Sequence, residues 1–141
     1  MKLKLWIAFI LSFNLFSDNR SLSCKENCQV FDHFAQACLY RTKCQFEGNG
    51  CVIQIRCDKW DNFSQNCRYE GKTTQCHNSN PWLPAPSCQQ TCQYWDSFQE
   101  ICLYETQCEY FAQNCLIQTR CERWDNFNNT CLSEQKDFQC P

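Results

Sequence analysis

The sequence predicts a small disulfide-rich fold: two tandem eight-cysteine domains, built mainly of short β-hairpins. Three observations support this prediction. Cysteine accounts for 16 of the 141 residues, a density typical of disulfide scaffolds. These cysteines form two sets of eight that register at an offset of 64 residues. One frame, Cys-x2-aromatic-Asp-x-Phe-x3-Cys, recurs four times, beginning at Cys28, Cys57, Cys92 and Cys121.

Residues 1–23 have the layout of a secretory signal peptide. Two lysines precede an apolar run over 5–16, and Ser21 and Ser23 place small side chains at the −3 and −1 positions of a cut before Cys24. The run is short for a bilayer-spanning helix, although an uncleaved anchor is the alternative. The secretory route is oxidising, and disulfides form and persist there. We therefore expect a secreted, extracellular or cell-surface protein with no membrane span in the mature chain.

Residues 24–76 and 88–140 are tandem copies of one domain. They are identical at 24 of 53 aligned positions, and all eight cysteines align without a gap. The linker between them, 77–87, contains three prolines, which favour an extended, semi-rigid spacer. Each copy is too small to depend on a hydrophobic core alone. We therefore expect disulfides, each contributing on the order of 2–4 kcal/mol, to decide whether the domain folds.

Eight cysteines per copy indicate four disulfides in each domain, with none left over. Spacing alone does not determine which cysteines pair. The residues expected to form disulfides are Cys24, Cys28, Cys38, Cys44, Cys51, Cys57, Cys67, Cys76, Cys88, Cys92, Cys102, Cys108, Cys115, Cys121, Cys131 and Cys140.

The recurring frame is compatible with two conformations. As a helix, its cysteines and aromatic residues lie near one face, and the paired Cys-x9-Cys spacing resembles the helical hairpins of mitochondrial intermembrane-space proteins. As a β-hairpin, the frame is joined to segments rich in strand-forming residues, Cys51–Cys57 and Cys115–Cys121. A strong hairpin turn, Gly48-Asn49-Gly50, precedes the first of these segments. We favour the hairpin and keep short disulfide-stapled helical hairpins as the alternative.

The hairpin interpretation also suggests one disulfide. If Phe34 lies opposite Cys38, the antiparallel register places Cys28 opposite Cys44. A cross-strand disulfide could use that pairing.

Two segments carry a family resemblance, Phe31-Asp32-x5-Cys38-x-Tyr40-x3-Cys44 and Trp95-Asp96-x5-Cys102-x-Tyr104-x3-Cys108. Each resembles the closing hairpin of peritrophin-A-type chitin-binding domains over about 14 residues. This resemblance implies a β-hairpin and a chitin-like glycan as ligand. The strict cysteine periodicity, with aromatic residues after a signal peptide, also resembles the cysteine-repeat surface antigens of ciliates. That second resemblance implies a role in a surface coat.

The chain shows no arrangement typical of catalysis. Its two histidines, His33 and His77, do not recur in the second copy, so we expect no catalytic residue, no metal site and no cofactor. The formal net charge is −2, without a basic stripe, so we expect no nucleic-acid partner. One aspartate recurs in each frame, and we expect it to accept backbone N–H groups at a turn or helix start. These residues are Asp32, Asp61, Asp96 and Asp125.

Recurring aromatic residues are the candidate contact sites. Phe31, Trp60, Trp95 and Trp124 occupy equivalent positions, and such rings either pack over a disulfide as a small core or stack on sugars or on a neighbouring subunit. Trp82, in the linker, is difficult to bury in either domain and is a candidate partner contact. Two N-glycosylation sequons begin at Asn62 and Asn128, near the predicted hairpin tips.

The sequence therefore predicts a secreted, non-enzymatic structural or surface-coat subunit that self-assembles into a fibre or matrix, because a head-to-tail contact that does not close forms a filament. We expect its partners to be further copies of itself or other extracellular proteins. A carbohydrate-binding module for chitin-like glycans is the alternative. A secreted ligand or inhibitor scaffold is a third interpretation.

Overall fold

A computed structural model describes residues 22, 24–47, 50–80, 82–111 and 113–141, and these residues form β-structure without any helix. The predicted hairpin fold is confirmed, and the helical alternative is wrong. This part of the chain accordingly has no helix long and apolar enough to cross a membrane. Apart from Leu22, the predicted signal peptide lies outside the described residues, as do two residues of the predicted turn at 48–50.

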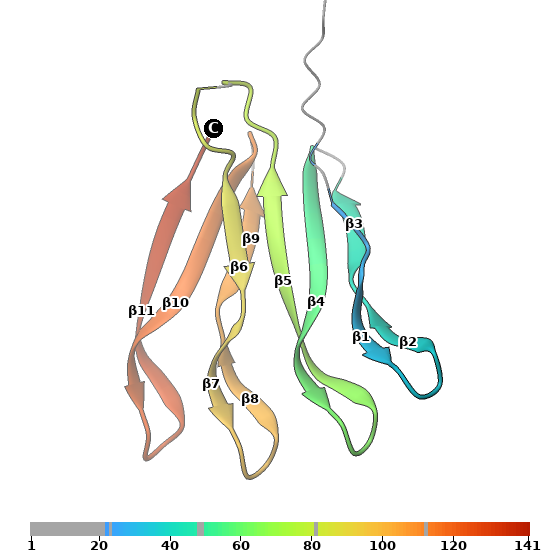
Figure 1. Ribbon diagram of the computed structural model, residues 1–141. Coiled ribbons are helices and arrows are strands. Elements are labelled where there is room, and N and C mark those ends of the chain that lie inside the picture. Colours follow the sequence, from blue (N-terminus) through green and yellow to red (C-terminus); the bar gives the residue numbers. More distant parts are fainter. Residues whose placement is uncertain (1–21, 23, 48–49, 81, 112) are drawn as a thin grey trace, which may run out of the picture.

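The strands follow one another in two similar series, and their bounds are β1 (Cys28–Asp32), β2 (Ala37–Arg41), β3 (Lys43–Glu47), β4 (Cys51–Asp61), β5 (Asn66–Cys76), β6 (Ser87–Gln90), β7 (Cys92–Asp96), β8 (Ile101–Glu105), β9 (Gln107–Phe111), β10 (Cys115–Asp125) and β11 (Thr130–Gln139). Four hairpins contain the recurring frame: β1–β2, β4–β5, β7–β8 and β10–β11. They lie in a row, and all four tips point towards the same side of the molecule (Figure 1).

Each hairpin is closed by a disulfide between the two cysteines of its own frame. The Cα atoms of the bonded cysteines are 5.8 Å apart in all four cases, Cys28–Cys38, Cys57–Cys67, Cys92–Cys102 and Cys121–Cys131. The remaining bridges are Cys24–Cys44, Cys51–Cys76, Cys88–Cys108 and Cys115–Cys140. Every bridge stays within its own repeat and no cysteine is free, which confirms the prediction of four disulfides in each half.

The suggested pairing of Cys28 with Cys44 is wrong. Phe31, and not Phe34, lies opposite Cys38, because Phe34 belongs to the turn and not to a strand. Irregular pairing along β1 then places Cys28 opposite Arg41. Cys28 therefore bonds Cys38, and Cys44 bonds Cys24.

The four hairpin turns share one construction, as expected for the recurring aspartates. Oδ1 of Asp32 accepts the backbone N–H groups of Phe34 and Ala35, at 2.8 and 3.0 Å. Asp61, Asp96 and Asp125 make the same pair of contacts in their own turns. The last residue of each turn has a positive φ between 51° and 53°, and these residues are Gln36, Gln65, Glu100 and Asn129. The carboxylate thus supports a tight turn without any glycine in it.

Beyond the hairpins, the strands continue into two sheets. β3, β4, β5 and β6 form one sheet in that order, and β11, β10 and β9 form the other. The buried cluster at their centre consists of Cys51, Cys76, Cys88 and Leu116. Three of these four residues are half-cystines, so the core is largely made of disulfides, as expected for domains of this size.

The two repeats are joined by strand pairing. β6, the first strand of the second repeat, pairs with β5 of the first repeat. In the linker, the N–H of Cys76 donates to Pro86 O at 2.9 Å, and Nδ2 of Asn78 donates to Pro84 O at 3.0 Å. The described linker residues therefore form a reversing loop. The prediction of an extended spacer is wrong, because the backbone groups of β6 are satisfied only when β6 returns to the edge of β5.

Candidate interaction surface

A ladder of aromatic residues runs along the row of hairpins. The tyrosine of each hairpin lies edge-on to the tryptophan of the next one, with ring centroids 6.0–6.5 Å apart. The pairs are Tyr40 with Trp60, Tyr69 with Trp95, and Tyr104 with Trp124. The three tryptophans are neither fully buried nor fully exposed. Each tryptophan ring therefore packs against the tyrosine of the preceding hairpin and is partly exposed to solvent.

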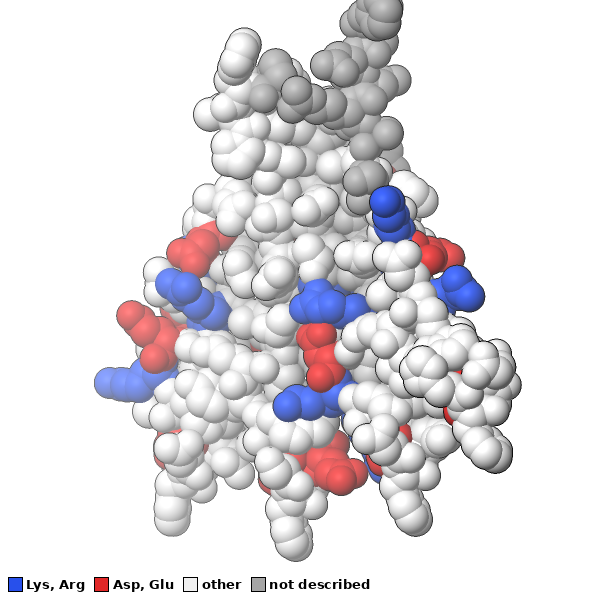
Figure 2. All heavy atoms as spheres, viewed as in Figure 1, with Lys and Arg blue, Asp and Glu red and all other residues white. Residues whose placement is uncertain are grey.

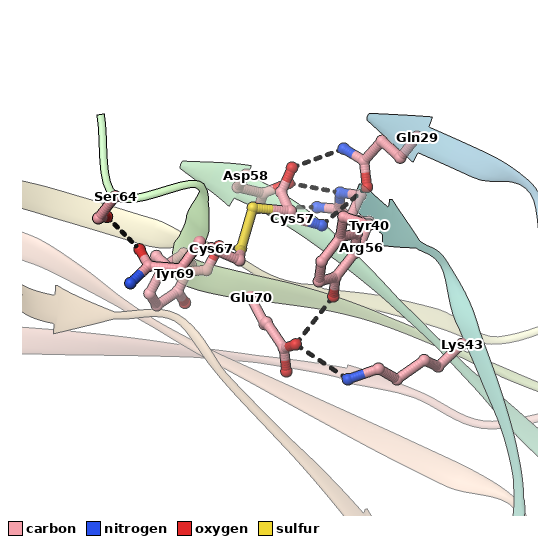
Figure 3. Close-up of a disulfide and its surroundings, with 11 residues drawn as sticks. Gln29, Tyr40, Lys43, Arg56, Cys57, Asp58, Ser64, Cys67, Tyr69 and Glu70 are labelled. Atoms are coloured by element: carbon pink, nitrogen blue, oxygen red, sulfur yellow. Dashed lines mark hydrogen bonds and ion pairs between the residues drawn. A yellow bond between two sulfur atoms is a disulfide. The ribbon is translucent and has the colours of Figure 1, made fainter. Parts of the chain in front are cut away.

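The same tyrosines make a repeated hydrogen bond. Each hydroxyl donates to a glutamate on the next hairpin at 2.9 Å, as in Tyr40–Glu70, Tyr69–Glu105 and Tyr104–Glu134. Figure 3 shows Tyr40 and Lys43 both directed at Glu70, the lysine at 3.2 Å. This series of hydrogen bonds does not continue beyond the four hairpins. The fourth hairpin has Ser133 at the position of the tyrosine, and the first hairpin has Arg41 at the position of the glutamate.

This arrangement shifts the ionisation of the partners. Burial first, and then the hydrogen bond to Glu70, raise the pKa of Tyr40 to about 12. Burial and the hydrogen bond to Glu134 likewise raise the pKa of Tyr104 to about 12. Burial and Glu105 also raise the pKa of Tyr69. Burial alone would raise the pKa of Glu70, but the bonds from Tyr40 and Lys43 outweigh it and lower that pKa below its usual value.

In each repeat, a glutamine on the first hairpin forms hydrogen bonds with the second hairpin. The glutamine directly follows the first cysteine of the frame. Nε2 of Gln29 donates to Cys57 O at 2.6 Å, and the Cys57 N–H donates back to Oε1 at 2.8 Å. Gln93 makes the same two bonds with Cys121. The role of Gln29 and Gln93 was not predicted from the sequence, although their identity across the duplication is a detectable signal.

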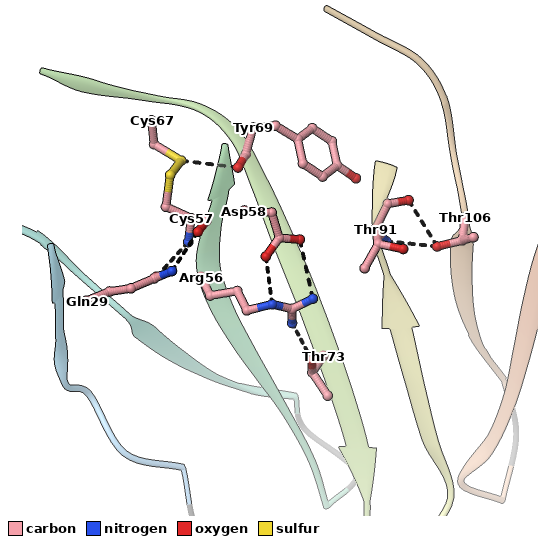
Figure 4. A network of polar contacts seen from close by, with 9 residues as sticks. All are labelled: Gln29, Arg56, Cys57, Asp58, Cys67, Tyr69, Thr73, Thr91 and Thr106. Atoms are coloured by element: carbon pink, nitrogen blue, oxygen red, sulfur yellow. Dashed lines mark hydrogen bonds and ion pairs between the residues drawn. A yellow bond between two sulfur atoms is a disulfide. The ribbon is translucent and has the colours of Figure 1, made fainter. Parts of the chain in front are cut away.

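Other polar contacts join the short connections between strands, such as Thr91 between β6 and β7 and Thr106 between β8 and β9. The N–H of Thr91 donates to Thr106 Oγ1 at 2.8 Å, and the N–H of Thr106 donates to Thr91 O at 2.9 Å (Figure 4). Arg56 lies between Asp58, at 2.8 Å, and the Thr73 hydroxyl, at 2.6 Å, in the same view. These contacts position the hairpins.

A hollow of about 250 Å³ lies where the second hairpin meets the third. It contains two of the candidate tryptophans, Trp60 and Trp95, together with Asp61, Arg68 and Glu100. Nζ of Lys59 lies 5.3 Å from the ring centroid of Trp95. Part-exposed indoles beside polar side chains are the residue types that stack on and hydrogen-bond to a sugar.

The most exposed aromatic residues are the turn phenylalanines, which were not among the candidate contact residues predicted from the sequence. The phenylalanine of each turn is 93–100% exposed, and these residues are Phe34, Phe63, Phe98 and Phe127. In Figure 2 the charged side chains gather across the middle of the visible face, and the hairpin tips project beyond them as uncharged fingers. Phenylalanine recurs at this position in all four frames, which indicates a shared role. The predicted register, with Phe34 opposite Cys38, placed it in a strand and not in the turn.

The remaining candidate residues lie on the surface. Asn62 and Asn128 are exposed residues of the second and fourth hairpin turns, and Nδ2 of Asn128 donates to Asp125 at 2.8 Å. Trp82 is 91% exposed in the linker loop. Phe31 is 44% exposed at the first hairpin, so it is more open than its tryptophan counterparts. The structure thus aligns Trp60, Trp95 and Trp124 in one ladder and leaves Trp82 apart from it.

The described residues contain no cluster of three or more His, Cys, Asp or Glu side chains suited to a metal ion. A comparison of the chain with protein-family models, curated proteins and solved structures finds no match. The fold and the site therefore define a class only: a small disulfide-rich β protein made of two similar halves, whose many disulfides indicate an oxidising, extracellular environment.

Proposed function

We propose that this chain is a secreted, non-enzymatic structural or surface-coat subunit that self-assembles into a fibre or matrix. One observation carries the proposal: the two repeats join because a strand of one completes the sheet of the other, β6 on β5. A contact of this kind is heterologous, because it joins a different strand of each unit. A further copy can therefore use the same geometry, and repetition yields a linear assembly.

The covalent structure suits such a role. Four disulfides stabilise each half mainly by restricting the unfolded chain, so the subunit keeps its shape when diluted outside the cell. The Tyr–Glu and Gln–backbone contacts between hairpins keep the four hairpins in one row. A stiff, elongated row of hairpins is a useful building block for a coat or fibre.

The test is sedimentation velocity of the protein secreted by a eukaryotic host, purified without reductant and run at several concentrations. The proposal expects species larger than the monomer whose proportion rises with concentration, and expects reduction of the disulfides to abolish them. A single monomer boundary at every concentration would refute self-assembly.

A second candidate function is binding of chitin-like glycans, and the hollow at Trp60 and Trp95 favours it. Stacking of a sugar on these rings would change their fluorescence. Soluble chitin oligosaccharides should then quench the emission of the wild type but not of the Trp95→Ala variant. Trp82→Ala is the matched control, because Trp82 lies in the linker loop outside the hollow. Unchanged emission at saturating oligosaccharide would rule out this function.

A further inference from the structure

The joint between the two repeats is a template for a joint between molecules. β5 and β6 pair antiparallel, with Lys72 opposite Gln90, Thr73 opposite Gln89 and Thr74 opposite Cys88. The joint buries its third pair, since Thr74 is 8% exposed and Cys88 is 1% exposed. Each of these residues has a counterpart 64 positions away in the other repeat.

The counterpart of β5 is β11, whose outer edge is open. Within the described residues β11 pairs with β10 alone, whereas β5 pairs with both β4 and β6. The loss of the partner strand shows in the exposure of its residues. Phe138, the counterpart of the buried Thr74, is 64% exposed, and Lys136 is exposed whereas Lys72 is half-buried.

The counterpart of β6 is the segment 24–26, which is held in place but unpaired. Lys25 O accepts hydrogen bonds from Thr42 Oγ1 and Gln54 Nε2, both at 3.2 Å. The equivalent atom in β6, Gln89 O, accepts the equivalent bonds from Thr106 and Gln118, both at 3.0 Å. The Cys24–Cys44 bridge anchors the segment just as Cys88–Cys108 anchors β6. The segment is therefore held by the same contacts as β6, but among the described residues it pairs with no strand.

We propose that residues 136–138 on the β11 edge of one molecule pair antiparallel with residues 24–26 of a second copy of this chain. The β5–β6 register transferred by 64 residues places Lys136 opposite Glu26, Asp137 opposite Lys25 and Phe138 opposite Cys24. Both charged pairs are complementary, although the internal joint has neutral residues opposite Lys72 and Thr73. Opposite charges on directly facing strand positions attract, and like charges repel.

Other contacts of the internal joint carry over in part. Lys59 lies over the ring of Trp95 across the internal joint. The counterparts are Arg123 and Phe31, which can also form a cation–π pair, although phenylalanine is a weaker partner than tryptophan. The Tyr69–Glu105 hydrogen bond has no equivalent, because its counterparts are Ser133 and Arg41. The joint between molecules therefore depends more on charge than the internal joint does, and we expect it to weaken as salt screens exposed pairs.

This joint uses two different ends of the molecule, so it is heterologous and adds copies head to tail. It also covers Phe138 and the open β11 edge, which are the features that otherwise invite unspecific strand pairing. The inference rests on the proposed function, self-assembly, and names the surface that performs it.

The experiment measures sedimentation of the secreted full-length protein and of charge variants, at low and high salt. Lys136→Glu places like charges opposite Glu26 and should weaken assembly by about tenfold or more. Glu26→Lys places like charges opposite Lys136 and should do the same. An equimolar mixture should assemble again, because each variant then faces its complement at both ends. Lys72→Glu is the matched control, since it changes the same charge at a position already paired within the chain.

Glu26 accepts the N–H of Cys44, so its substitution also removes a bond within the chain. Lys25→Glu provides a second disruption, and the Lys25 side chain makes no hydrogen bond or ion pair among the described residues. It places like charges opposite Asp137 and should also weaken assembly. The proposed joint is supported if the single variants lose assembly, the mixture recovers it and Lys72→Glu behaves as the wild type. If the wild type assembles and the variants match it, the joint is wrong while self-assembly stands. If the wild type stays monomeric at every concentration, both proposals fail.

Discussion

The hydroxyl of Tyr69 donates a hydrogen bond of 2.9 Å to Glu105, across the boundary between the two repeats. The same bond joins Tyr40 to Glu70 and Tyr104 to Glu134 inside the repeats. Hairpins within a repeat and hairpins of different repeats are thus linked by one and the same contact. The duplication has produced a continuous row of four hairpins, and not two separate modules on a tether (Figure 1).

Removal of this bond between the repeats should destabilise the protein. Tyr69→Phe leaves the ring on Trp95 but leaves Glu105 without its donor, and we expect a loss of about 1 kcal/mol in the free energy of unfolding. Denaturant unfolding of the disulfide-bonded protein measures it. Tyr94→Phe is the control, because the Tyr94 hydroxyl makes no hydrogen bond among the described residues while its ring stacks on Trp124. Equal stabilities for the two variants would contradict the proposed contribution.

The ladder tyrosines should titrate late. The pKa values of Tyr40 and Tyr104 are raised from 10.0 to about 12. Folding therefore favours the protonated hydroxyl, so the stabilisation is complete below about pH 10 and is lost as the pH rises towards 12. Phenolate absorbance followed against pH measures these pKa values. The reduced protein in denaturant should show all tyrosines titrating near the ordinary value, and the same curve for the native protein would contradict the ladder.

A side chain at position 71 should destabilise the protein. A Cβ built there would overlap Oδ2 of Asp58, which is held by its ion pair with Arg56. Gly71→Ala should therefore displace Asp58 and cost roughly 1–3 kcal/mol, as overpacking does. Thermal unfolding checks this. The matched variant is Gln135→Ala at the equivalent position of the second repeat. It removes the hydrogen bonds with Arg120 and Asp137 but displaces no neighbouring side chain, so we expect a loss of about 0.5–1 kcal/mol, smaller than that of Gly71→Ala. A Gly71→Ala protein as stable as the wild type would contradict the close contact.

The turn aspartates should act as hydrogen-bond acceptors and not as charges. Oδ1 of Asp96 accepts the N–H groups of Phe98 and Gln99 at 2.8 and 3.0 Å. Asp96→Ala removes both bonds and should cost about 1 kcal/mol. Asp96→Asn keeps an oxygen acceptor and should cost much less. Denaturant midpoints compare the two, and an asparagine variant as unstable as the alanine variant would show that charge dominates.

The sequence predicted the β-hairpins, the two halves and the four disulfides of each half. These predictions depend on local patterns: strand-forming residues between cysteines, a turn-forming aspartate and an even cysteine count. The pairing of Cys28 was predicted incorrectly, because the register depends on where the turn ends. The contacts of Asp32 start the turn early enough to place Phe34 outside the strand.

The candidate surface was predicted less well than the fold. The equivalence of Trp60, Trp95 and Trp124 was evident, but their tyrosine partners lie on neighbouring hairpins, 20 or more positions away in sequence. The linker was predicted to be extended from its prolines. The antiparallel pairing of β5 with β6 makes the linker reverse the chain direction. This pairing depends on the strands on either side of the linker, so it leaves no pattern in the linker sequence itself.

Amide hydrogen exchange, compared between dilute and concentrated protein, tests the central claim most directly. If the molecules join through the open β11 edge, concentration should slow exchange at residues 136–138 and at 24–26. Exchange at the hairpin turn 62–65 and at β5 should stay the same. Slower exchange confined to other segments, or exchange that does not depend on concentration, would contradict assembly through β11.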